Sequence, residues 1–179
     1  MNQKELLSLY KSQATVQALA EAIKPNESKT INLKGLVGSL DAITAAAAYQ
    51  LNHQTHIFVL HEKEEAAYFY NDLQNLLGDK EVLLFPSSYK RAYEFEETEN
   101  ANILMRAEIL NRINNKSSAG ELIVTYPEAL TEKVINKKSL VQNTFTAKVT
   151  EQVDRDFLTE LLLNYGFVQD DFVYEPGQF

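Results

Sequence analysis

Apolar and polar residues alternate along the chain with two different periods, and this difference separates helical segments from extended ones. Apolar residues three or four positions apart predict an amphipathic helix from Leu6 to Ile23, which Pro25-Asn26 ends. Further helical patterns cover residues 41–51, 62–77, 103–113 and 127–134. Short runs rich in β-branched and aromatic residues predict strands at 30–33, 56–60, 81–85 and 122–125.

The order of these elements predicts the fold class. Strands alternate with helices from Thr30 to about Asn136, at spacings that suit right-handed crossover connections. We therefore expect an α/β domain in which a parallel sheet is flanked by helices. The polar segment 87–100 contains Glu94, Glu96, Glu97 and Glu99, and we interpret it as a solvated loop that leads into the next helix.

The hydrophobic spacing changes near Asn136, where we place a domain boundary. Beyond it, Val141, Phe145, Ala147 and Val149 alternate with polar residues and predict a half-exposed antiparallel strand. Asp154 is predicted to cap a helix ending at Gly166, whose buried face carries Phe157, Leu158, Leu161 and Leu162. The chain is thus expected to comprise a lead-in helix and linker at 1–29, the α/β domain at 30–136 and the start of a small α/β domain at 137–179.

The last residues predict a hairpin. Residues 172–174 have strand composition, and Glu175-Pro176-Gly177-Gln178 places Pro and Gly at the two central positions of a type II turn. The returning strand would begin at Phe179. Because a strand without its partner is not stable, we expect the sequence to be the front piece of a longer polypeptide.

Composition narrows the function. The 179 residues are 45% hydrophobic and 23% charged, which is typical of a globular protein. A net charge of −8 disfavours a broad surface for duplex DNA, since such a surface must be basic. The chain contains no cysteine, which suits a reducing cytoplasm and rules out thiolate metal sites. No stretch is apolar enough to serve as a signal peptide or to span a membrane, so we expect a soluble, cytoplasmic protein.

One loop has the position of a phosphate-binding loop, between a predicted strand and a helix. Read against G-x-x-x-x-G-K-[ST], Gly35 matches the first glycine, whereas Leu40, Asp41 and Ala42 replace the second glycine, the lysine and the hydroxyl residue. A carboxylate in place of the ammonium group repels a triphosphate instead of attracting it. We therefore expect a tight structural turn, with Gly38 and Ser39 able to hold at most a stray anion.

Other candidate chemistry is weaker. His53 and His56 lie three residues apart, but one is expected near a helix end and the other at a strand start, so we expect no metal site with His61. Ser87 and Ser88 follow a strand but lack the G-x-S-x-G setting of a nucleophile. We expect no catalytic residue, bound cofactor or metal in this chain.

The order of five motifs resembles that of the bacterial transcription-repair coupling factors (Mfd), whose front end is a degenerate copy of the excision-repair protein UvrB. The motifs are GLVGSLDA, IFVLHEKEEAAYFYNDLQNLL, VLLFPSSYKRAYEF, LIVTYPEALTEKV and FLTELLLNYGFVQDDFVYEPGQF. The resemblance implies a helicase-like domain 1a followed by a small domain 2, the module that docks on UvrA. The short stretch between Tyr93 and Ile103 leaves no room for the long aromatic hairpin with which UvrB probes damaged DNA.

The same resemblance implies a function. It suggests a non-catalytic module that helps to recruit UvrA to stalled RNA polymerase in transcription-coupled nucleotide excision repair. The complete protein would also carry an ATP- and Mg²⁺-dependent DNA translocase and a module that binds RNA polymerase. A P-loop ATPase or helicase domain with an altered loop is the alternative, and a structural domain that packs on its own chain is a third possibility.

A docking face for UvrA, if this segment holds one, is expected where aromatic and acidic residues cluster near the end of the sequence: Tyr165, Phe167, Asp170, Phe172 and Tyr174. The simpler interpretation is that these aromatic rings form the core of the small domain, because aromatic residues are more often buried than exposed. The family's basic UvrA-contacting residues would lie after Phe179.

Overall fold

The computed structural model describes residues 2–24, 28–78, 80–91, 94–98, 100–114, 120–142, 144–174 and 177–179. Its centre is a parallel sheet of three strands, β1 (His56–Val59), β2 (Val82–Leu84) and β5 (Leu122–Thr125), in the order β1-β5-β2. His56 and Val82 both pair with Leu122, so β5 is flanked by a strand on each side. These strands and the surrounding helices confirm the predicted α/β class.

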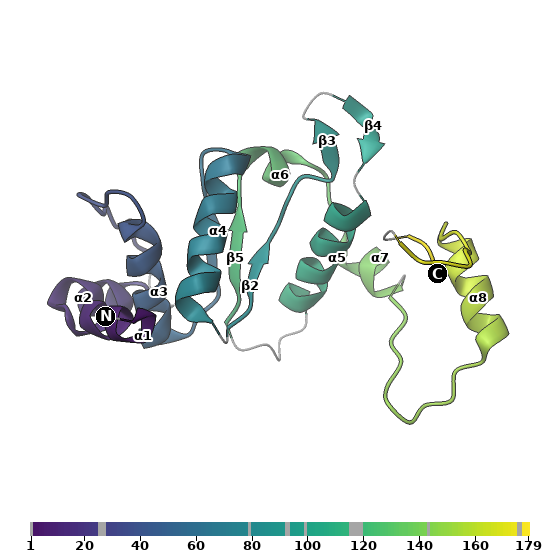
Figure 1. Cartoon of the computed structure of the whole chain (residues 1–179), viewed down its shortest axis with the longest axis horizontal. Coiled ribbons are helices and arrows are strands. Elements are labelled where there is room, and N and C mark those ends of the chain that lie inside the picture. The colour runs from purple at the N-terminus through teal and green to yellow at the C-terminus, as the bar shows by residue number, and fades with distance from the viewer. Residues whose placement is uncertain are drawn as a thin grey trace.

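Helices cover the two faces of this sheet unequally (Figure 1). Helix α4 (Lys63–Leu77) packs on one face, where Phe69 lies against Phe58 of β1 with ring centroids 5.1 Å apart. Helix α5 (Asn100–Asn114) lies on the opposite face near β2, where Ile109 is buried. Because α5 reaches only part of this second face, Ile57 and Val59 of β1 remain more than half exposed, at 58% and 53%.

The amino-terminal helices form a layer beyond α4. Helices α1 (Gln3–Ser12) and α2 (Ala14–Ala22) pack on α3 (Leu40–Asn52), which in turn packs on α4. The single lead-in helix expected from the sequence is therefore two helices. Gln13 has an extended backbone at the break, and the Ser12 hydroxyl donates to the Leu9 carbonyl at 2.7 Å. The predicted stop at Pro25-Asn26 lies outside the described residues.

The strand predicted at 30–33 is absent: residues 28–37 have no regular secondary structure. A strand requires a hydrogen-bonded partner, and the three sheet strands pair only with one another in the part of the chain that the structure describes. Ile31 and Leu33 consequently stay 39% and 48% exposed. Residues 30–33 do alternate between apolar and polar side chains, but no described strand of the sheet pairs with this segment.

The prediction of a solvated loop at 87–100 is also wrong. The segment contains two antiparallel strands, β3 (Tyr89–Arg91) and β4 (Glu94–Thr98). In this hairpin, which is separate from the main sheet, the charged segment pairs its backbone groups. The hairpin stands beyond the end of the sheet, next to the short helix α6 (Pro127–Thr131) (Figure 1).

Residues after Asn136 differ most from expectation. The strand expected from Val141 to Val149 is absent, and its first two residues belong to helix α7 (Lys137–Gln142). The Asn136 side chain accepts a hydrogen bond from Ser139 N–H at 3.0 Å at the start of this helix. Residues 144–149 form no strand, and Val149 is 95% exposed.

Helix α8 (Arg155–Asn164) has the predicted ends but not the predicted burial. The Asp154 side chain accepts hydrogen bonds from the N–H groups of Asp156 and Phe157, which confirms the cap. At the other end the Phe167 and Gly166 N–H groups close the helix through the carbonyls of its last turn. Of the face predicted to be buried, Leu158, Leu161 and Leu162 are only half-buried and Phe157 is 50% exposed, so the predicted burial is wrong for Phe157 and too high for the leucines.

The hairpin predicted at the end of the sequence is not formed as expected. Residues 172–174 are not a strand, and the backbone instead pairs Val168 with Gln178 in a parallel bridge. Of the predicted turn, Glu175 and Pro176 lie outside the described residues, while Gly177 has the positive φ, +100°, that the prediction required.

Candidate functional site

The candidate phosphate loop forms a tight turn at the start of α3. Gly35 and Gly38 have φ angles of +80° and +59°, which only glycine adopts without strain. The Leu40 N–H group bonds to the Val37 carbonyl, and the helix begins at Leu40. The expected glycine-punctuated turn before a helix is therefore present, although no strand precedes it. Ser39 precedes the helix but makes no side-chain capping bond.

Asp41 alters the electrostatics of this helix end. Its carboxylate oxygen Oδ1 accepts the Ala42 N–H group at 2.7 Å. The free N–H groups of a helix amino terminus attract anions, and here a carboxylate of the chain itself bonds to one of them. A phosphate group that approached the same groups would meet an existing negative charge.

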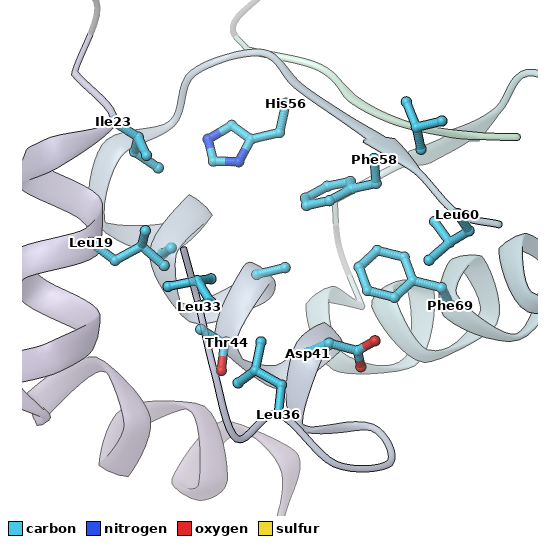
Figure 2. A pocket seen from close by; sticks show the side chains of 13 residues that line it. Leu19, Ile23, Leu33, Leu36, Asp41, Thr44, His56, Phe58, Leu60 and Phe69 are labelled. Carbon is cyan, nitrogen blue, oxygen red and sulfur yellow. The ribbon is translucent and has the colours of Figure 1, made fainter. Parts of the chain in front are cut away.

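An apolar pocket lies directly beside the loop (Figure 2). It has a volume of about 330 Å³ and lies between α2, the segment 33–36, α3, β1 and α4. Its apolar wall is formed by Leu19, Ile23, Leu33, Leu36, Ala45, Ala48, Phe58, Val59, Leu60 and Phe69. The pocket therefore continues the hydrophobic core up to the loop instead of presenting polar donors.

Three polar side chains complete the lining, Asp41, Thr44 and His56. The Thr44 hydroxyl donates to the Leu40 carbonyl at 2.7 Å within α3. Burial lowers the pKa of His56, which favours the neutral imidazole, and its Nε2 atom lies 3.3 Å from Asn52 Oδ1. The described residues of the lining include neither lysine nor arginine, and Asp41 is the one carboxylate among them. These residues do not fit the triphosphate of ATP or a Mg²⁺ ion held by it.

A second polar cluster lies at the carboxyl end of β2, and sequence reasoning missed it. The Arg106 guanidinium is buried over the Phe85 ring, donates to the carbonyls of Pro86 and Ala129 at 2.7 and 3.0 Å, and pairs with the Glu132 carboxylate at 3.5 Å. Nothing in the spacing of these residues marks them as partners, because they come from three separate segments.

The two serines join the same cluster. Ser88 donates to Glu132 through both its N–H group, at 2.8 Å, and its hydroxyl, and Ser87 donates through its hydroxyl at 3.1 Å. The Ser87 N–H group donates to the Tyr126 hydroxyl at 2.9 Å. Both hydroxyls are directed to a carboxylate that Arg106 already pairs, so the arrangement is a structural brace at the base of the β3–β4 hairpin.

The histidines are not gathered into a metal site. His53 and His56 both lie edge-on to Tyr49, with ring centroids 5.4 and 5.8 Å from it. His61 instead bonds through its N–H group to Glu65, at the start of α4. Among the described residues, no three histidine or carboxylate side chains are close enough to share a metal ion.

The expected aromatic cluster near the end of the sequence lies largely in solvent. Tyr165, Phe172 and Tyr174 are 45%, 68% and 82% exposed, so the interpretation of these rings as a domain core is wrong. Phe172 and Tyr174 stack with ring centroids 6.2 Å apart, and Asp170 beside them is exposed. Phe167 is half-buried and lines a separate hollow of about 450 Å³ between α5 and the end of α8.

No helix within the described ranges is both long and apolar enough to cross a lipid bilayer.

Comparison with known proteins adds relatives but no family. No model of a known protein family matches the sequence. The transcription-repair-coupling factor of Bacillus subtilis (strain 168) is 24% identical over 148 residues, which are 82% of this chain and 12% of that protein.

The UvrABC system protein B of Metamycoplasma arthritidis and that of Mycoplasmopsis pulmonis are each 26% identical over 174 residues. These alignments cover 92% of this chain and 26% of each relative. The chain therefore spans about an eighth to a quarter of the length of the relatives that it matches. As the order of motifs predicted, the chain is a distant relative of the transcription-repair coupling factors and of UvrB.

Proposed function

We propose that this chain is a non-catalytic, UvrB-like module of a transcription-repair coupling factor, which helps to recruit UvrA to stalled RNA polymerase during nucleotide excision repair. The likeness to both kinds of repair protein supports the assignment to DNA repair. The observation that carries the non-catalytic role is the Asp41 carboxylate, which bonds to Ala42 N–H at the helix end where a phosphate would bind.

The magnitude of the charge effect favours this proposal over an ATPase. Two unit charges about 4 Å apart interact by roughly 4 kcal/mol at an effective dielectric constant near 20. Replacing lysine by Asp41 changes the sign of that interaction. The apolar wall beside the loop supplies no compensating cation.

Calorimetric titration with the ATP analogue AMP-PNP and Mg²⁺ tests this role. We expect no binding heat at micromolar to low-millimolar concentrations, and the same result for the variant Asp41→Asn, which still lacks the lysine. Saturable, Mg²⁺-dependent binding in the micromolar range would overturn the proposal and favour the ATPase alternative.

The candidate contact with UvrA is the cluster of Tyr165, Phe167, Asp170, Phe172 and Tyr174, of which all but the half-buried Phe167 are exposed. The exposure of Tyr165, Phe172 and Tyr174 supports this proposal, because large aromatic rings that remain exposed on a folded domain are typical of interaction sites. The neighbouring carboxylate of Asp170 complements a basic partner surface.

A capture experiment with purified UvrA tests the surface. We expect the double variant Phe172→Ser, Tyr174→Ser to lower the amount of UvrA captured at least tenfold, as is typical when central aromatic contacts are lost. The matched control is Val149→Ser, which removes a side chain that is 95% exposed elsewhere. Equal capture by all three proteins excludes this surface, and capture by none of them contradicts the UvrA assignment.

The remaining assignments follow the resemblance. We propose that RNA polymerase, DNA, ATP and Mg²⁺ are bound by other parts of the protein to which this module belongs, and that it works in the cytoplasm. We also propose that a domain boundary lies near Asn136.

A further inference from the structure

We propose that the apolar pocket beside the loop binds a small, uncharged aromatic or aliphatic molecule and rejects anions. This inference does not depend on the proposed contact with UvrA. It rests on the shape, the lining and the charge of the pocket.

The shape is that of a ligand site. Five segments of the chain surround a hollow of about 330 Å³, which lies within the range of roughly 300–1,000 Å³ that is typical of small-molecule pockets. Figure 2 shows Leu19 and Ile23 on one side of the hollow and Phe58 and Phe69 on another. Phe69 belongs to the main hydrophobic core and Phe58 packs against it, so the core anchors this side of the hollow.

The lining determines the class of molecule. A lining of apolar side chains and two aromatic rings favours an apolar ligand, because such a ligand buries its own apolar surface when it binds. Small residues on α3, Ala45 and Ala48, leave space where larger side chains would fill the hollow. The Thr44 hydroxyl already donates to its own helix and offers no free donor to an anion.

Charge determines what is rejected. Among the lining residues that the structure describes, Asp41 is the one acidic residue, and none is a lysine or arginine that would offset it. His56 does not supply a positive charge at neutral pH, because burial lowers its pKa. An anion that entered would therefore lose water and gain only repulsion.

Two fluorescent probes that differ by one charged group test the proposal. N-phenyl-1-naphthylamine is neutral, and 1-anilinonaphthalene-8-sulfonate has the same rings with a sulfonate added. We expect the neutral probe to bind with one site per chain and at least tenfold more tightly than the sulfonate. Asp41→Asn should reduce the difference in affinity between the two probes, because it removes the charge that repels the sulfonate.

Two neighbouring substitutions locate the site. Leu36 lines the pocket and is 37% exposed, whereas Val37 does not line it and is 81% exposed. Leu36→Glu should weaken binding of the neutral probe at least tenfold, and Val37→Glu, which adds the same charge one residue away, should leave it within twofold. Both positions are on the surface, so circular dichroism should show an unchanged fold.

Equal affinity for the two probes, equal effects of the two glutamate variants, or no binding of the neutral probe would each overturn the proposal. Displacement of the neutral probe by millimolar AMP-PNP would also overturn it, because the pocket would then be a nucleotide site. Failure to capture UvrA would leave all of these results unaffected.

Discussion

Two carboxylates, Asp41 and Glu132, have opposite environments, and each determines a property of its site. Asp41 lies at a helix end beside an apolar pocket, where its Oδ1 atom accepts a hydrogen bond from the Ala42 N–H group. Glu132 has 11% of its side chain exposed and is held by Arg106 and two serines. The role of Asp41 could be predicted from the sequence, because a motif assigns a lysine to its position. The role of Glu132 could not be predicted, because its three partners are 26, 44 and 45 residues away in the sequence.

The Glu132 brace predicts a pH dependence of stability. Burial by itself raises the pKa of Glu132, but hydrogen bonds from Ser88, the charge of Arg106 and the Ser87 hydroxyl together lower it below the ordinary value of 4.5. A carboxyl whose pKa is lower in the folded protein stabilises it above the unfolded pKa, and this contribution disappears as the pH falls through the folded pKa. We therefore expect the Glu132 contribution to be complete at pH 6 and to decline below about pH 4.5.

Urea unfolding of Glu132→Gln measures this contribution. At pH 7 the variant should lose about 3 kcal/mol, because Arg106 is then buried without a counter-charge. The difference from the unchanged protein should shrink between pH 4.5 and pH 3. Glu128→Gln, an exposed position in helix α6 just before Glu132, is the control and should change stability by less than about 0.5 kcal/mol. If the difference in stability between the two proteins does not change with pH, Glu132 does not stabilise the fold through its charge.

At the scale of elements, helices followed the sequence more closely than strands did. Asp154 caps α8 as predicted, and α4 and α5 cover the expected residues, because helix hydrogen bonds and caps are local. The extended segments 30–33 and 172–174 did not become strands, since pairing depends on which backbone edge is available elsewhere. The β3–β4 hairpin was missed because its charged residues were interpreted as a solvated loop, although Tyr93 and Phe95 alternate with glutamates in the sequence.

The cap of α8 offers a test at this scale. Asp154→Ala removes the acceptor of two N–H groups and should cost about 1 kcal/mol of local helix stability. Because no residue of α8 is fully buried, packing cannot compensate, and amide hydrogen exchange in the first turn should become about fivefold faster. Asp171→Ala, an exposed position outside any helix, serves as the comparison and should leave these amides unchanged. Unaltered exchange in Asp154→Ala would show that the cap does not hold the helix.

At the scale of the whole molecule, one hydrophobic core holds the fold together. Its buried members run from Leu7 to Ala129 and come from the amino-terminal helices, the parallel sheet and helices α4 to α6. Helices α7 and α8 contribute none of them, and Figure 1 shows α8 at the far end of the molecule from α1 and α2. The boundary near Asn136 stays a prediction.

Truncation tests that boundary. A protein of residues 1–136 should unfold in one cooperative transition, with a free energy of unfolding within about 1 kcal/mol of the longer chain, because the core remains intact. Loss of Leu140, which is 7% exposed, accounts for the small expected change. A non-cooperative transition or a much larger loss would mean that the residues after Asn136 belong to the same folding unit.

The sequence by itself determined the α/β class, the main helices, the turn before α3 and the missing lysine, because each depends on residues that are close together in the chain. Only the tertiary structure decided that β5 lies between β1 and β2, that Arg106 meets Glu132, and that an apolar pocket opens beside Asp41. These features depend on which distant segments pack together. The packing of distant segments is determined by how the whole core is buried, and local sequence patterns do not specify it.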